Sequence, residues 1–135
     1  MANFDVLFVN PGNAKKIYQS LSGTFSAIEP PFLAALAADF IRNNGFEPDI
    51  LDSNALGMDF EETGIEVARR DPQLVNIIVH GQQPSASTQL MSAVGPLCRE
   101  IKNKNPEVKI LLTGTHPSAL PERTMKDEAC DFVGQ

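Results

Sequence analysis

Residues 74–86, with the sequence LVNIIVHGQQPSA, decide the fold. An apolar, β-branched run, Leu74–Val79, leads directly into the six-residue pattern GQQPSA, and such a run is typical of a strand buried on both faces of a parallel sheet. The pattern returns as GTHPSA at Gly114–Ala119, after a second apolar run at Val108–Leu112. In an open parallel α/β sheet, loops that leave neighbouring strands at their carboxyl ends line one crevice, where ligands bind. The two copies therefore predict a binding crevice. The alternative is that both are ordinary strand-to-helix turns, since Gly, Pro and Ser are common turn residues.

Strands and helices are predicted to alternate along the whole chain. The predicted strands are Asp5–Val9, Glu47–Leu51, Leu74–Val79, Val108–Leu112 and Cys130–Val133. The predicted helices are Pro31–Asn43, a segment from near Asp59 to just before Pro72, Ser85–Lys104 and Pro121–Glu128. This order predicts an α/β fold: a three-layer α/β/α, Rossmann-like (flavodoxin-like) domain with a parallel five-stranded sheet in the order 2-1-3-4-5.

Local signals support two of these helices and predict an irregularity in a third. In the first helix, Leu33, Leu36 and Phe40 recur at helical spacing with Ala37 and Ile41. In the second, Asp59 is a plausible cap with Glu62 three residues later. In the third, Gly95-Pro96 predicts a kink or an irregular turn.

Composition describes one ordinary globular domain of 135 residues, with 42% hydrophobic and 21% charged residues. A net charge of −6 argues against a general nucleic-acid binder, which needs a basic surface for the phosphates. The first residues lack the basic start of a signal peptide, and the apolar run Val6–Val9 is too short to cross a bilayer. We therefore expect a cytoplasmic protein that binds neither nucleic acid nor membrane.

No catalytic or metal site is predicted. The two cysteines, Cys98 and Cys130, have no metal-ligand spacing, and three would be needed for an iron–sulfur cluster with an open iron. Neither histidine, His80 or His116, has a carboxylate at a spacing that marks a catalytic pair. A small-molecule enzyme complete within these residues is the weakest hypothesis.

Several common ligands of such a crevice do not suit these loops. The stretch Asn10–Lys15 has one glycine, so it lacks the dinucleotide spacing, and no Gly-Lys-Ser/Thr follows it as in a Walker loop. His80 stands where a phosphate-accepting receiver domain would have an aspartate, and the stretch Asn10–Lys15 lacks the hydroxyls expected there for FMN. The remaining loop side chains are polar but nearly uncharged, which suits a large ligand that carries many amides.

Six stretches that span nearly the whole chain carry a family resemblance. They are Leu7–Pro11 (LFVNP), Glu29–Ala37 (EPPFLAALA), Asp49–Asp52 (DILD), Val79–Ala86 (VHGQQPSA), Thr113–Glu122 (TGTHPSALPE) and Asp131–Gly134 (DFVG). This pattern resembles the cobalamin (B12)-binding domains that precede radical SAM cores, and Gly114–Glu122 is its most specific part.

The resemblance implies a Rossmann-like domain that holds the corrin over the carboxyl edge of the sheet. The nucleotide tail would be buried between the first and third strands. The cofactor-binding residues it implies are Asn10, Pro11, Gly12, His80, Gly81, Gln82, Gln83, Ser85, Gly114, Thr115, His116 and Pro117. Residues 1–135 would then be a cobalamin-binding domain cut from a longer radical SAM protein. The C-terminal core of that protein, its partner, would bind S-adenosylmethionine and a 4Fe-4S cluster for methyl transfer or related radical chemistry.

The chain departs from the family pattern at three places. The loop after the first strand has no histidine, so a histidine ligand to cobalt is not expected. Thr115 stands where the family usually has a second glycine, and Gln135 where it usually has glutamate. These departures keep a second hypothesis open: a flavodoxin-like interaction or scaffolding domain whose corrin site has decayed.

Overall fold

The sheet forms as the sequence predicts. The computed structural model describes residues 4–12, 28–81 and 84–135, and in it five parallel strands lie in the order β2-β1-β3-β4-β5. The strands are β1 (Phe4–Asn10), β2 (Pro48–Asp52), β3 (Pro72–Val79), β4 (Lys109–Gly114) and β5 (Phe132–Val133). The predicted flavodoxin-like order is therefore confirmed, with each strand end within two residues of its predicted place.

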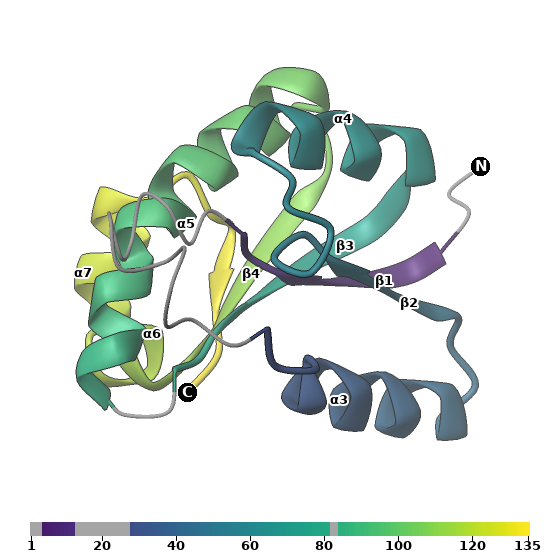
Figure 1. Cartoon of the computed structure of the whole chain (residues 1–135), viewed down its shortest axis with the longest axis horizontal. Helices are drawn as coiled ribbons and strands as arrows, with labels where there is room; N and C mark the ends of the chain where they lie inside the picture. The colour runs from purple at the N-terminus through teal and green to yellow at the C-terminus, as the bar shows by residue number, and fades with distance from the viewer. Residues whose placement is uncertain (1–3, 13–27, 82–83) are drawn as a thin grey trace.

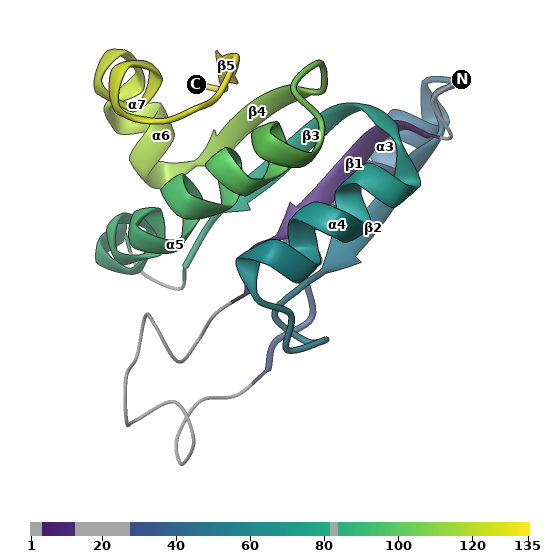
Figure 2. The same cartoon turned by 90° about the horizontal axis from the view of Figure 1, so that it is seen from above.

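Helices cover both faces of this sheet, which gives the three layers (Figures 1 and 2). They are α3 (Phe32–Asn43), α4 (Phe60–Arg70), α5 (Pro84–Lys104), α6 (Thr115–Ala119) and α7 (Pro121–Asp127). The short helix α6 was not predicted. No helix within the described part of the chain is long and apolar enough to cross a membrane.

The larger core lies between the sheet and the helices α4 and α5. Alternate residues of the central strands, such as Val75 and Ile77, are fully buried there against Val67 of α4 and Leu97 of α5. On the opposite face, a smaller cluster joins Phe8 to the buried alanines of α3. Figure 1 shows α3 alone below the sheet, while α4 and α5 lie side by side above it.

Two local predictions have different outcomes. The predicted cap of α4 is confirmed, because Asp59 and Glu62 form a reciprocal capping box. No irregular turn interrupts the chain at Gly95-Pro96, since α5 continues through Pro96 as one helix, and the predicted kink stays a prediction. Packing of this helix against the buried core on either side of Pro96 outweighs the one backbone hydrogen bond that proline removes.

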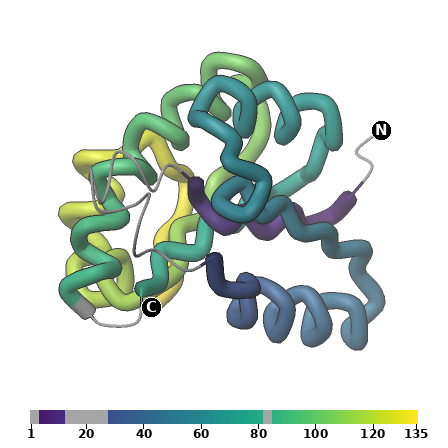
Figure 3. The backbone as a smooth tube through the Cα atoms, viewed as in Figure 1, coloured from purple at the N-terminus to yellow at the C-terminus, as the bar shows by residue number. Residues whose placement is uncertain are grey.

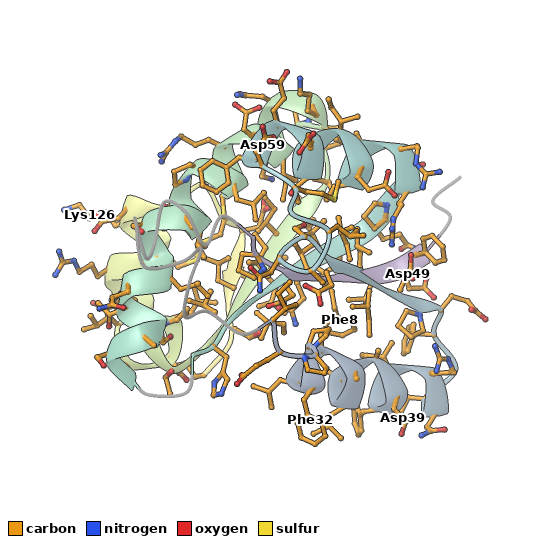
Figure 4. The ribbon with its side chains drawn as sticks, viewed as in Figure 1. Phe8, Phe32, Asp39, Asp49, Asp59 and Lys126 are labelled. Atoms are coloured by element: carbon orange, nitrogen blue, oxygen red, sulfur yellow. The ribbon has the colours of Figure 1, made fainter. Side chains whose placement is uncertain are left out.

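Helix α3 begins and ends almost where predicted, but most of its large apolar residues do not face the core. The residues that pack on the sheet include Ala34 and Ala38, whereas Phe32, Leu36 and Phe40 are exposed. In Figure 4, Phe8 lies between the sheet and α3, and Phe32 points away from the sheet.

Candidate functional site

The candidate site lies where β3 and β4 end, as the repeated pattern predicts. Val79 ends β3 and pairs with Gly114, which ends β4, so the two copies of the pattern leave the sheet side by side. Figure 3 shows the end of the chain reaching the same edge. An open groove of about 600 Å³ lies there. Its lining residues are His80, Thr113, Gly114, Thr115, Ser118, Ala119, Gly134 and Gln135.

Ser87 holds the two copies of the pattern together. Its hydroxyl is buried in the first turns of α5, donates a hydrogen bond to the Val79 carbonyl oxygen at 2.7 Å, and accepts one from the His116 backbone N–H at 3.0 Å. One side chain thus links the end of β3, the start of α5 and the start of α6. Because both partners are backbone groups, Ser87 fixes the shape of the edge rather than facing a ligand.

Gly114 is required by this geometry. Its φ is +137°, a backbone conformation that side chains with a Cβ rarely adopt. A Cβ there would also overlap the carbonyl group of Val79 on the neighbouring strand. The bare backbone of Gly114 therefore permits close approach of the two strand ends and leaves one wall of the groove free of a side chain.

The two histidines have different positions. His80 is exposed and lines the groove. The Nδ1 atom of His116 lies 3.0 Å from the Thr88 hydroxyl, so a hydrogen bond to α5 orients this half-buried ring. Pro117 is buried, and His116 and Pro117 are not among the residues that line the groove.

The predicted residues after β1 lie elsewhere. Asn10 donates a hydrogen bond from Nδ2 to Asp52 Oδ1 at 2.8 Å, across the ends of β1 and β2. Pro11 and Gly12 are buried, and a Cβ on Gly12 would come within 2.8 Å of the Ser53 carbonyl oxygen. Asn10 and Gly12 thus contact the end of β2 and the residues after it, and none of the three is among the residues that line the groove.

The residues of the first copy of the pattern have different positions relative to the groove. Gly81 is half-buried, and a Cβ there would overlap Ala86 in the first turn of α5. Ser85 is exposed and is not among the residues that line the groove. Gln82 and Gln83 lie outside the described residues, so their predicted contact with the cofactor stays a prediction.

The predicted path of the nucleotide tail between the first and third strands stays a prediction, and the backbone limits it to the carboxyl ends of these strands. β1 and β3 are directly hydrogen-bonded neighbours, paired from Phe4 opposite Pro72 to Val9 opposite Ile77. Strands in such a ladder are only about 4.8 Å apart, which leaves no room for a ligand between them. The groove lies instead beside the ends of β4 and β5. The sequence analysis did not predict Ser87 or Gly134 as residues of this edge. Ser87 lies only two residues after Ser85, which it did predict.

The described residues contain no group of three His, Cys, Asp or Glu side chains that could hold a metal ion. Burial raises the pKa of the Cys98 thiol and also that of Cys130, so both favour the neutral form. The thiols therefore have the character of packing residues and not of nucleophiles.

The family model described as "B12 binding domain" matches residues 19–135. Among solved structures, the fold is similar to a radical S-adenosylmethionine methyltransferase, TsrM, from Kitasatospora setae, solved with its tryptophan substrate and a SAM analog. The TM-score is 0.63 with 20% sequence identity, over 86% of this chain and 20% of that enzyme's chain. No curated protein sequence matched the chain.

Proposed function

The chain belongs to the B12-binding domain family, and we propose that it holds cobalamin over the carboxyl edge of its sheet as one domain of a longer radical SAM enzyme. The groove at the ends of β3, β4 and β5 is the observation that carries this proposal. It lies at the edge where open parallel sheets bind their ligands.

The described lining of the groove suits the nucleotide tail of cobalamin in size and in chemistry. A volume of about 600 Å³ falls in the range of small-molecule sites, which is roughly 300–1,000 Å³. Among the described residues, the lining contains hydroxyl, amide and imidazole side chains and no Asp or Glu side chain. Such a lining can donate hydrogen bonds to the phosphate of a nucleotide tail without charge repulsion. The bare backbone of Gly114 lets the tail approach the sheet edge closely.

We assign the tail to this groove and the corrin to the edge above it. His80, Thr115 and Ser118 would contact the tail, while Ser87 and Gly114 maintain the shape of the edge. When bound, cobalamin supplies a cobalt that can accept and deliver a methyl group. We propose that neither histidine ligates that cobalt: the loop after β1 has none, His116 is oriented by Thr88, and His80 lies with the tail.

The longer enzyme is the part of the proposal that rests on resemblance. This chain spans about a fifth of the methyltransferase it resembles in fold. With only two cysteines, both argued above to be packing residues, it would depend on another domain for a 4Fe-4S cluster and S-adenosylmethionine. Methyl transfer or a related radical reaction would then take place between the cobalt and a substrate held by that domain.

Titration with hydroxocobalamin, read by the visible spectrum and by co-elution of corrin and protein on gel filtration, tests the proposal. We expect retention of the corrin, a tighter or equal affinity for Thr115→Gly, and a weaker affinity for Ser118→Val, which places an apolar group in the groove. His80→Ala should leave the cobalt spectrum nearly unchanged, and a large shift would identify His80 as an axial ligand.

The second hypothesis, a scaffolding domain with a decayed corrin site, has one observation in its favour. Thr115 replaces a glycine, is exposed, and lines the groove, so its side chain occupies space near the tail. This hypothesis predicts a folded, colourless protein whose melting temperature no corrinoid changes. Bound ligand at a hundredfold over its Kd should instead stabilise the fold by about 2.7 kcal/mol.

A further inference from the structure

The outer side of helix α3 carries an apolar stripe that is exposed among the described residues. Phe32, Leu36 and Phe40 are 67%, 53% and 68% exposed, and Ile28 just before the helix is 66% exposed. The side that packs on the sheet includes the small residues Ala34 and Ala38. The usual arrangement places the large apolar residues of a surface helix toward the core. A stripe with the reverse arrangement indicates an interface.

The stripe is symmetric along the helix. Phe32 and Phe40 each lie four residues from Leu36, so the order Phe-Leu-Phe is the same in both directions. Residues spaced by four form one ridge on a helix, and two such ridges can interdigitate when helices cross. In a two-fold interface, residue i of one copy contacts residue j of the other, and j contacts i. With the axis at Leu36, Phe32 of each copy would lie on Phe40 of the other.

Charges beside the stripe agree with antiparallel packing. Glu29 lies before the start of α3 and Arg42 near its end, so antiparallel helices place opposite charges near each other at both ends. Asp39 accepts a hydrogen bond from Asn43 on the same helix, which provides a polar rim next to the ridge. Burial of Ile28, Phe32, Leu36 and Phe40 in both copies would remove on the order of 1,000 Å² from water, the smallest area expected for a specific interface.

We propose that α3 is a dimer interface, on which a second copy of this chain packs antiparallel about a two-fold axis at Leu36. This surface is a different one from the cofactor groove, and its test needs no corrinoid.

Sedimentation equilibrium of the whole chain over a wide range of concentration is the first test. We expect a reversible monomer–dimer equilibrium, and Leu36→Asp should raise the dimer Kd at least tenfold because it would bury two carboxylates at the axis. Ile65→Asp is the matched control, since Ile65 is similarly exposed at 51% on α4 and should leave the Kd unchanged. A chain that stays monomeric, or equal effects of the two variants, would overturn the proposal.

Cysteine cross-linking tests the geometry itself. In a Cys130→Ser background with oxidised glutathione as oxidant, Leu36→Cys should form a disulfide-linked dimer readily, because the two sulfurs would meet at the axis. Phe32→Cys mixed with Phe40→Cys should cross-link with each other and much less with themselves. Preferred 32–32 cross-links, or cross-linking of Ile65→Cys at the same rate, would exclude an antiparallel interface at Leu36. Circular dichroism of each variant confirms that it is folded.

Discussion

The two edges of the sheet are held together by different chemistry. At the carboxyl edge, the groove is shaped by neutral hydrogen bonds from Ser87 and by the close approach of Gly114 to Val79. At the opposite edge, ion pairs join the helix ends to the strands. Arg70 of α4 binds both Glu66 and Asp49, and Lys102 of α5 binds Asp131 at 2.7 Å.

This difference separates ligand binding from electrostatic stabilisation. Neutral buried hydrogen bonds depend little on salt or on pH, whereas partly exposed ion pairs depend on both. The edge that we assign to cobalamin can therefore keep its shape while the ionisation of the other edge changes. The following substitutions test that separation, beginning with the largest expected effect.

Gly114→Ala should have the largest effect. Its Cβ would overlap the Val79 carbonyl and would force a side chain into a φ of +137°, so we expect a loss of at least about 3 kcal/mol in the free energy of unfolding. Urea unfolding followed by circular dichroism measures it. Gly57→Ala is the control, because Gly57 has a φ of +65° but nothing within 4 Å of its Cβ position. It should cost about 1–2 kcal/mol from backbone strain alone. Equal costs for both would show that the close approach at Gly114 is unimportant.

Ser87→Ala should have the next largest effect on the free energy of unfolding. It removes the donor to the Val79 carbonyl and the acceptor for the His116 N–H, both at a buried hydroxyl, and we expect a loss of about 2 kcal/mol. Corrinoid affinity should fall with it, because the start of α6 would lose its attachment to α5. Ser92→Ala is the control on the same helix, since its hydroxyl is exposed and bonds only the Gln89 carbonyl. A Ser87 variant as stable as this control would contradict the proposed role of the hydroxyl.

The strands and most helices could be predicted because each rests on a local signal, and the strand order follows from their alternation and the common flavodoxin-like topology. Apolar runs such as Leu74–Val79 mark central strands, and the Asp59–Glu62 box marks the start of α4. The roles of individual loop residues depended on three-dimensional contacts. Asn10 ends β1 and Gly12 follows it, as expected, but their partners Asp52 and Ser53 lie some forty residues away along the chain.

The role of Ser87 also depends on a contact that the sequence alone does not reveal. Ser85 and Ser87 have similar neighbours in sequence, and only the helical turn decides which of them faces Val79. The exposure of Phe32 and Phe40 could not be predicted either, since an apolar period of three to four residues predicts a helix but not which of its sides packs on the sheet.

At the opposite edge, Glu66→Gln should have a smaller effect that depends on pH. Hydrogen bonds from Arg69 and then Arg70 lower the pKa of Glu66 from 4.5 to about 2. Because the folded state favours the ionised carboxylate, this stabilisation is fully present above about pH 4.5 and is lost as the pH falls toward 2. We expect the variant to lose about 1 kcal/mol at neutral pH and nothing at the acidic limit.

The measurement is the difference in unfolding free energy between Glu66→Gln and the unsubstituted chain as a function of pH. Asp127→Asn provides the control, because its pair with Arg123 is widely exposed and should contribute little at any pH. Ser87→Ala should show a loss that stays constant through the same range. A Ser87 effect that follows pH as the Glu66 effect does would contradict the division between the two edges.

Ser85→Ala should have the smallest effect, although the sequence assigned this serine to the cofactor site. Ser85 is exposed at the start of α5 and is not among the residues that line the groove, so the variant removes no described contact with the edge. We expect a change in unfolding free energy within about 0.5 kcal/mol, as is usual for surface substitutions, and an unchanged hydroxocobalamin Kd. The decisive measurement is the Kd beside that of Ser87→Ala. If Ser85→Ala weakens corrinoid binding more than Ser87→Ala does, the cofactor contacts the first turn of α5 directly. The tail would then lie over the first copy of the pattern rather than beside β4 and β5.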